Sequence, residues 1–136
     1  MPDSYWILGV RLAGCFHFVT LLLASRTPIP PGWEENLAKL PAMHRRFAVV
    51  QNATIGGMIA VLGLLSLCFA PELAGGAPLA RAVCGMTALF WGFRAGVMPW
   101  LAVRPALTTP WLRLGHALLL AECVTYALAY GYLALR

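Results

Sequence analysis

The sequence predicts an all-α membrane protein: a single domain over residues 1–136 that forms an up-down four-helix transmembrane bundle, with a short interfacial helix after the first span. Hydrophobic residues make up 60% of the chain and charged residues only 11%, whereas about a quarter of the residues in a soluble domain are charged. Four apolar stretches are each about 20 residues long, which is the length a helix needs to cross the hydrocarbon core of a bilayer. No stretch alternates between apolar and polar residues as the wall of a membrane β-barrel does, so the spans are expected to be helices.

The four expected spans cover residues from about 5 to 25, 46 to 70, 81 to 103 and 111 to 134. Between the first two, the segment "PGWEENLAKL" predicts a short interfacial helix, because Trp33, Leu37 and Leu40 fall on one face and Pro41 ends it. The other two connections, "PELAGGAPLA" and "RPALTTP", are short. Adjacent spans are therefore expected to be antiparallel neighbours.

The basic residues predict the orientation of these spans. The first and third connections, with the span ends beside them, carry six basic residues, namely Arg26, Lys39, Arg45, Arg46, Arg104 and Arg113, whereas the opposite side carries Arg81 and Arg136. Because cytoplasmic loops are enriched in Lys and Arg, both termini are expected on the non-cytoplasmic side of the membrane. The net charge of +5 is not gathered into a basic stripe, so we expect a lipid bilayer and no nucleic acid as the partner of these charges.

Small residues at helical spacing predict close contacts between helices. They form three stripes: Asn52, Gly56, Ala60 and Gly63; Ala88, Gly92 and Gly96; and Ala127 and Gly131. Such stripes allow two helix backbones to approach closely. The contacts are expected within one chain or between copies, so a homo-oligomer or a larger membrane complex is a possible form of the protein.

Polar residues at similar depths predict a buried polar cluster near the cytoplasmic face. At 1.5 Å per residue, six of them lie within about 16 Å of the cytoplasmic ends of their helices: His17, Gln51, Asn52, Arg94, His116 and Glu122. Arg94 is costly to bury without a partner, and Glu122 is the only acidic residue inside an expected span. We therefore expect an Arg94–Glu122 ion pair, in which Asn52 and a histidine accept hydrogen bonds from the remaining N–H groups of Arg94. The alternative is a neutral Glu122 bonded to Thr125 or Tyr126 of its own helix, with Arg94 extended toward the headgroups.

Two cofactors are compatible with this cluster. His17 and His116 lie on the first and last spans and are candidate axial ligands of a b-type haem; otherwise they are hydrogen-bonded residues of the bundle. Phe90 and Trp91 are candidates for lining a quinone pocket, or else they face the core or the lipid. The four cysteines contain no C-x-x-C pair, so no metal site is predicted. No catalytic motif is present, which leaves enzymatic activity uncertain, with the balance against it.

These features predict a small integral membrane accessory or assembly subunit. The alternative from a different class is a redox or ligand-binding protein that holds b-type haem or quinone between spans one and four. A third interpretation is a small oligomeric transporter, for which a single four-span chain offers little room for a pore.

The order of four motifs resembles that of a group of small bacterial four-span membrane proteins with no assigned activity. The motifs are "VRLAGCFH", "HRRFAVVQNATIGGMIAVLGLLSL", "GAPLARAVCGMTALFWGFR" and "LRLGH", one in each expected span. The resemblance covers most of the chain and implies a four-span fold in the bacterial inner membrane. It implies no activity, cofactor or catalytic residue.

Overall fold

The computed structural model describes residues 4–27 and 32–136, which contain helices and no strand. The all-α prediction is therefore confirmed for this part of the chain. The elements are α1 (Ser4–Arg26), α2 (Trp33–Ala38), α3 (Ala42–Cys68), α4 (Ala70–Gly75), α5 (Pro78–Val97), the 3₁₀ turn η1 (Arg104–Ala106) and α6 (Pro110–Leu135).

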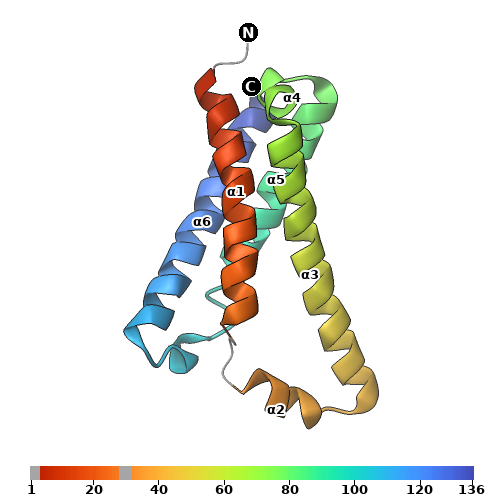
Figure 1. The fold of residues 1–136 in the computed structure, drawn as a ribbon, viewed down its shortest axis with the longest axis vertical. Coiled ribbons are helices and arrows are strands. Elements are labelled where there is room, and N and C mark those ends of the chain that lie inside the picture. Colours follow the sequence, from red (N-terminus) through yellow and green to blue (C-terminus); the bar gives the residue numbers. More distant parts are fainter. Residues whose placement is uncertain (1–3, 28–31) are drawn as a thin grey trace.

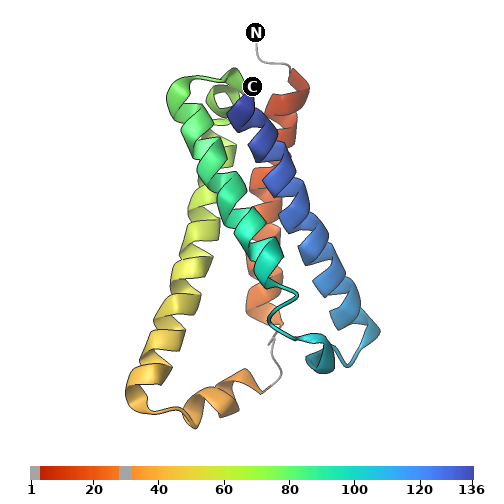
Figure 2. The ribbon, with the colours of Figure 1, turned by 180° about the vertical axis from the view of Figure 1, so that it is seen from behind.

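The four long helices pack as two antiparallel pairs (Figure 1, Figure 2). Helices α1 and α3 form the first hairpin, and α5 and α6 form the second. The helices of both pairs lie close together at the end of the molecule that carries α4. Helix α4 links the two hairpins at that joined end, where α1 begins and α6 ends. At the opposite end, which carries α2 and η1, helices α3 and α6 diverge, and we call it the splayed end.

Three helices, α1, α3 and α6, are long and apolar enough to cross a membrane. Their outward faces are apolar as well, with Leu8, Phe16, Phe47 and Leu128 among the exposed side chains. Apolar surface of this extent belongs in lipid rather than in water, so the helices indicate a multi-pass membrane protein. Helix α5, with 20 residues, is not among the helices that meet these criteria in the described part of the chain. The span expected over residues 81 to 103 is thus not confirmed.

Two helix ends differ from the sequence-based expectation because of proline. The second expected span ends at Cys68, and Pro71 lies in the first turn of the separate helix α4. The third ends at Val97 rather than near residue 103, and residues 98–102 form turns in which Ala102 has a φ of 48°. Pro99 lacks the backbone N–H that a continuing helix needs, so the helix ends beside it although Met98 itself still has helical backbone angles. Arg94 consequently lies in the last turn of α5.

The first hairpin is closest at two glycines. A Cβ atom added to Gly14 would lie 2.8 Å from the Leu67 side chain and 3.0 Å from the carbonyl oxygen of Gly63. A Cβ added to Gly63 would lie 2.9 Å from the Phe18 ring and 3.0 Å from Cβ of His17. Both separations are shorter than a normal van der Waals contact, so only glycine fits this crossing.

The glycines of the second hairpin leave more room than those of the first. A Cβ atom added to Gly92 would lie 3.7 Å from Cβ of Ala127, and one added to Gly131 would lie 3.8 Å from Cβ of Ala88. These distances are ordinary contacts. The expected small-residue stripes of α5 and α6 thus pack against each other within one chain.

The core is concentrated at the joined end and in the middle of the molecule. The largest fully buried side chains are Trp91, Leu133, His17, Cys84, Cys123 and Ser66. Every buried residue of α3 lies in its second half, from Ile59 to Ser66, whereas residues 42–58 contain none. The first half of α3 therefore buries no side chain against the described part of the chain.

Candidate functional site

His17 is the centre of a polar contact between the two hairpins. The ring is fully buried on α1, its Nδ1 lies 2.6 Å from the Ala13 carbonyl oxygen, and Trp91 donates its indole N–H to Nε2 at 3.1 Å. An indole nitrogen can only donate, so Nε2 must be the acceptor and Nδ1 must carry the proton that it donates to Ala13. The imidazole is accordingly neutral, and both of its nitrogens are occupied.

Glu122 of α6 makes a second contact between the hairpins. The Thr20 hydroxyl lies 2.8 Å and 2.7 Å from the two carboxylate oxygens, and Tyr126 donates to Oε1 at 2.7 Å. The Tyr126 oxygen also lies 3.2 Å from the Ala13 carbonyl oxygen that accepts from His17. The histidine and the glutamate thus belong to one network that joins α1 to α5 and α6.

The rings of this network pack on one another. His17 stacks on Tyr126 with a centroid distance of 4.5 Å and an interplanar angle of 17°. Trp91 meets both rings at steeper angles, at 5.2 Å from His17 and 5.0 Å from Tyr126. Such arrangements add stabilisation beyond that of the buried area. We call the set made of His17, Thr20, Trp91, Glu122 and Tyr126 the inter-hairpin cluster.

Arg94 does not form the expected ion pair with Glu122. Within the described ranges the ion pair that is present joins Lys39 and Glu35, and the Nε atom of Arg94 is buried without a hydrogen-bond partner. Arg94 and Glu122 are both close enough to the Cys123 side chain to act on it electrostatically, yet the carboxylate is turned toward Thr20 and Tyr126. Because Arg94 lies in the last turn of α5, the helix dipole partly stabilises its charge.

Gln51 and Asn52 lie apart from the inter-hairpin cluster. Both are exposed on the first half of α3. Their expected depths were counted along helices that pack over their whole length. In the structure α3 diverges from α1 toward the splayed end, and a Cβ atom added to Gly56 would already lie 3.9 Å from the Leu21 side chain. Asn52 instead lines a hollow of about 710 Å³ between the ends of α1 and α2.

The two candidate haem ligands do not face each other. His17 stacks on Tyr126, and His116 precedes Tyr126 by ten residues, or about 15 Å along α6. Axial ligands bind one iron from opposite faces of the macrocycle, and the nitrogens of His17 already bond to Ala13 and Trp91. These residues therefore do not fit a b-type haem.

The expected quinone pocket at Phe90 and Trp91 finds no support in the geometry. Trp91 is fully buried and edge-on to Phe90 at 5.2 Å, so this pair does not line an open quinone pocket. In the described residues no three His, Cys, Asp or Glu side chains are grouped so that they could hold a metal ion.

Two further contacts join the hairpins nearer the joined end. Tyr130 of α6 shares a hydrogen bond with Ser66 of α3, whose hydroxyl also bonds to the Leu62 carbonyl. Trp6 stacks on Tyr132 at 5.0 Å. The contacts between the hairpins thus consist of large or hydrogen-bonded side chains.

No protein-family model, curated protein or solved structure matches this chain. These comparisons therefore add no activity and no residue role to the resemblance noted in the sequence.

Proposed function

We propose that the protein is a small integral membrane accessory or assembly subunit, in which α5 crosses the bilayer beside α1, α3 and α6 to complete a four-span up-down bundle. The observation that supports this function is that the buried polar side chains bond to one another. His17 uses both ring nitrogens, and Glu122 accepts from Thr20 and Tyr126. A network of this kind holds two hairpins in register.

The surface that would contact a partner is the first half of α3. Residues 42–58 contain no buried residue, and the large apolar side chains Phe47 and Val50 are 66% and 62% exposed. The same segment carries the exposed amide of Gln51. Amide side chains at membrane depth stabilise helix association when they find partners on a neighbouring helix. These features favour a second membrane protein, or a second copy, against this half of α3.

The distribution of charge supports an orientation. The six basic residues of the first and third connections all belong to elements of the splayed end. At the joined end, Arg81 donates to the carbonyl oxygens of Ala134 and Leu135 and so caps α6. By the positive-inside rule the splayed end would face the cytoplasm and both termini the opposite side. The resemblance to small bacterial membrane proteins supports the bacterial inner membrane as the location.

Site-specific photo-crosslinking in the native membrane tests the accessory role. A photoreactive residue at Val50 should give one discrete crosslinked product with a membrane protein. The same residue at Leu89, which is 75% exposed on α5, is the matched control and should label lipid only. Identical product patterns at the two positions would show that the first half of α3 is not a partner surface.

A further inference from the structure

The connection between α5 and α6 differs in charge from the connection between α1 and α3. Beside α2, Lys39 is paired with Glu35 at 2.9 Å, so part of the positive charge of the first connection is compensated. Residues 98–121 contain Arg104 and Arg113 and no acidic residue. The two connections lie on separate arms of the splayed end (Figure 2). The positive charge of the α5–α6 connection therefore has no counter-charge within its own segment.

Leu107 holds the two arginines of this connection in one region. Its backbone N–H donates to the Arg104 carbonyl oxygen at 3.2 Å, and its carbonyl oxygen accepts from Nε of Arg113 at 3.1 Å. The Leu107 side chain is buried and so fixes these bonds against the bundle. The bond at Nε leaves the terminal N–H groups of Arg113 for an outside acceptor. The Arg104 side chain is exposed and makes no hydrogen bond or ion pair with the described residues.

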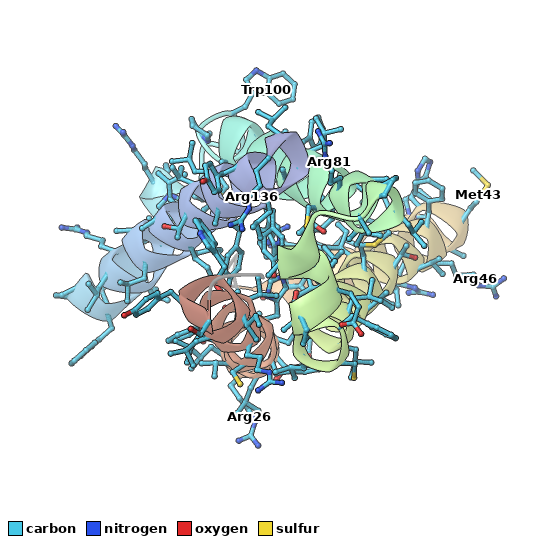
Figure 3. All side chains as sticks on the ribbon, turned by 90° about the horizontal axis from the view of Figure 1, so that it is seen from above. Arg26, Met43, Arg46, Arg81, Trp100 and Arg136 are labelled. Carbon is cyan, nitrogen blue, oxygen red and sulfur yellow. The ribbon has the colours of Figure 1, made fainter. Side chains whose placement is uncertain are left out.

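Exposed aromatic side chains accompany these arginines. Trp100 and Trp111 are 87% and 79% exposed, and Trp100 extends away from the helices when the molecule is seen along its long axis (Figure 3). Ala102 has a φ of 48°, which is unfavourable for a residue with a Cβ atom. Residues held in such conformations cluster at sites that contact ligands. Because tryptophan is enriched where a bilayer meets water, these features indicate a surface that contacts the headgroup region.

We propose that residues 98–113 bind the headgroups of anionic phospholipids such as phosphatidylglycerol. The proposal rests on the four-span arrangement proposed above, which puts this connection at a membrane surface. Arg104 and the terminal N–H groups of Arg113 donate to the phosphate, since guanidinium groups match phosphate oxygens in charge and geometry. Trp100 and Trp111 lie in the interfacial layer beside the bound lipid.

The charge of the connection selects among headgroups. Phosphatidylglycerol carries one uncompensated negative charge, whereas the ethanolamine and choline headgroups carry a cationic nitrogen beside the phosphate. Residues 98–121 offer no carboxylate that could accept this cation. The expected order of affinity is therefore phosphatidylglycerol first, and the ethanolamine and choline lipids after it.

Native mass spectrometry of the full-length protein in mild detergent, titrated with phosphatidylglycerol and phosphatidylcholine of the same acyl chains, tests the proposal. Phosphatidylglycerol should bind more tightly. Arg104→Gln/Arg113→Gln should weaken its binding about 25-fold, since each basic residue near a lipid headgroup contributes about five-fold. The matched control, Arg26→Gln/Arg46→Gln, removes the same charge from two exposed arginines that extend toward different sides of the molecule (Figure 3). The control should change the affinity by no more than about two-fold, because isolated exposed charges are screened by water and salt.

The single variant Arg104→Gln separates lipid binding from folding. Its side chain makes no hydrogen bond with the described residues, so thermal unfolding in detergent should be unchanged while phosphatidylglycerol binds about five-fold more weakly. Equal affinity of the unmodified protein for the two lipids would overturn the proposal. Equal losses in the two double variants would also overturn it, because they would show a general attraction of a basic protein for anionic lipid.

Labelling of Thr108→Cys with a membrane-impermeant maleimide in sealed vesicles separates this proposal from the proposed function. Thr108 is exposed and lies between the two arginines in the chain. Labelling from one side of the membrane, together with no preference for phosphatidylglycerol, would overturn the lipid site alone. Labelling no stronger than that of the unmodified protein from either side would show that the connection is not at a membrane surface. That result would overturn the four-span arrangement and the lipid site together.

Discussion

The contacts inside each hairpin and the contacts between the hairpins use different chemistry. Inside the first hairpin, Gly14 and Gly63 bring two backbones together, and no added methyl group fits. Between the hairpins, His17 with Trp91 and Thr20 with Glu122 span the gap through hydrogen-bonded side chains. In lipid, apolar side chains gain little by leaving the solvent, so packing of small residues and hydrogen bonds are the remaining sources of association. Close packing sets how near two helices lie, whereas directional bonds set which pairs meet and in what register.

The largest effect is expected at the crossing of the first hairpin. Gly63→Ala should lower the free energy of unfolding in detergent by about 2 to 3 kcal/mol, because its Cβ would press on Cβ of His17 and the Phe18 ring. The matched control is Gly57→Ala on the same helix, where a Cβ meets nothing within 4 Å. The control should be neutral or slightly stabilising. Equal stability of the two variants would contradict the prediction, because it would mean that α1 and α3 can move apart at Gly63 without loss of folding free energy.

The next effect concerns the histidine between the hairpins. His17→Leu leaves the indole N–H of Trp91 buried without an acceptor, and should cost about 1 to 2 kcal/mol. Adding Trp91→Phe removes the orphaned donor, so the double variant should lose less than the sum of the two single losses. A double-mutant cycle of thermal or denaturant unfolding measures this difference. Strictly additive losses would show that the bond contributes nothing.

A smaller effect is expected at Glu122. Its size distinguishes a Glu122 that only accepts hydrogen bonds from a Glu122 that is the counter-ion of Arg94. Hydrogen bonds from Thr20 and Tyr126 can be accepted by an amide oxygen, so Glu122→Gln should cost about 1 kcal/mol or less. Thr20→Val should cost about 0.6 kcal/mol, the mean for a hydrogen bond between membrane helices. If Arg94 depended on the carboxylate as its counter-ion, Glu122→Gln would cost about 3 to 5 kcal/mol instead. Unfolding of the two variants in detergent decides between these values.

The smallest effect is expected inside the second hairpin. Gly92→Ala adds a Cβ at 3.7 Å from Cβ of Ala127, which is an ordinary contact. Because alanine favours helix over glycine by about 1 kcal/mol, the variant should unfold at the same temperature as the original or slightly higher. A loss of stability as large as that of Gly63→Ala would show that a Cβ atom is no better tolerated at Gly92 than at Gly63. The two hairpins would then not differ in how closely their helices approach at these glycines.

The sequence was informative about the elements and less so about their tilt. Apolar runs located α1, α3 and α6, and small residues at helical spacing located the faces of α5 and α6 that touch. Depth estimates then placed Asn52 level with His17, although the structure separates them. The tilt of a helix depends on all of its packing contacts together. No local sequence pattern in α3 indicates that its first half diverges from α1.

The cluster was predictable in part. His17 and Glu122 were expected in it and lie there, but Arg94 was expected as the partner of Glu122 and is not bonded to it. Thr20 was overlooked as a donor, although it follows His17 by three residues and so shares its face. Which of several nearby donors a carboxylate accepts depends on rotations of a few degrees, which composition and spacing do not determine.

Proline provided a signal that the third expected span, residues 81 to 103, did not use. Pro71 and Pro99 each lie near the point where a long helix ends in the structure. A rule that ends every apolar helix just before proline would have shortened the third expected span, from residue 103 to residue 98, whereas the second expected span already ended at residue 70, directly before Pro71.

The separation of His17 from its partners along the chain has a consequence for biosynthesis. His17 and Trp91 are 74 residues apart, and Thr20 and Glu122 are 102 apart. At elongation rates of about 5 to 20 residues per second, the indole is made roughly 4 to 15 s after the imidazole. The first hairpin is complete once Cys68 is made, and from then until Trp91 and Glu122 follow it must persist in the membrane on its own contacts. The tight crossing of Gly14 and Gly63 provides them, and the imidazole waits with its Nδ1 proton bonded to Ala13 and its other nitrogen open. Arrival of the second hairpin then fills that open position, so the order of translation is also the order of assembly.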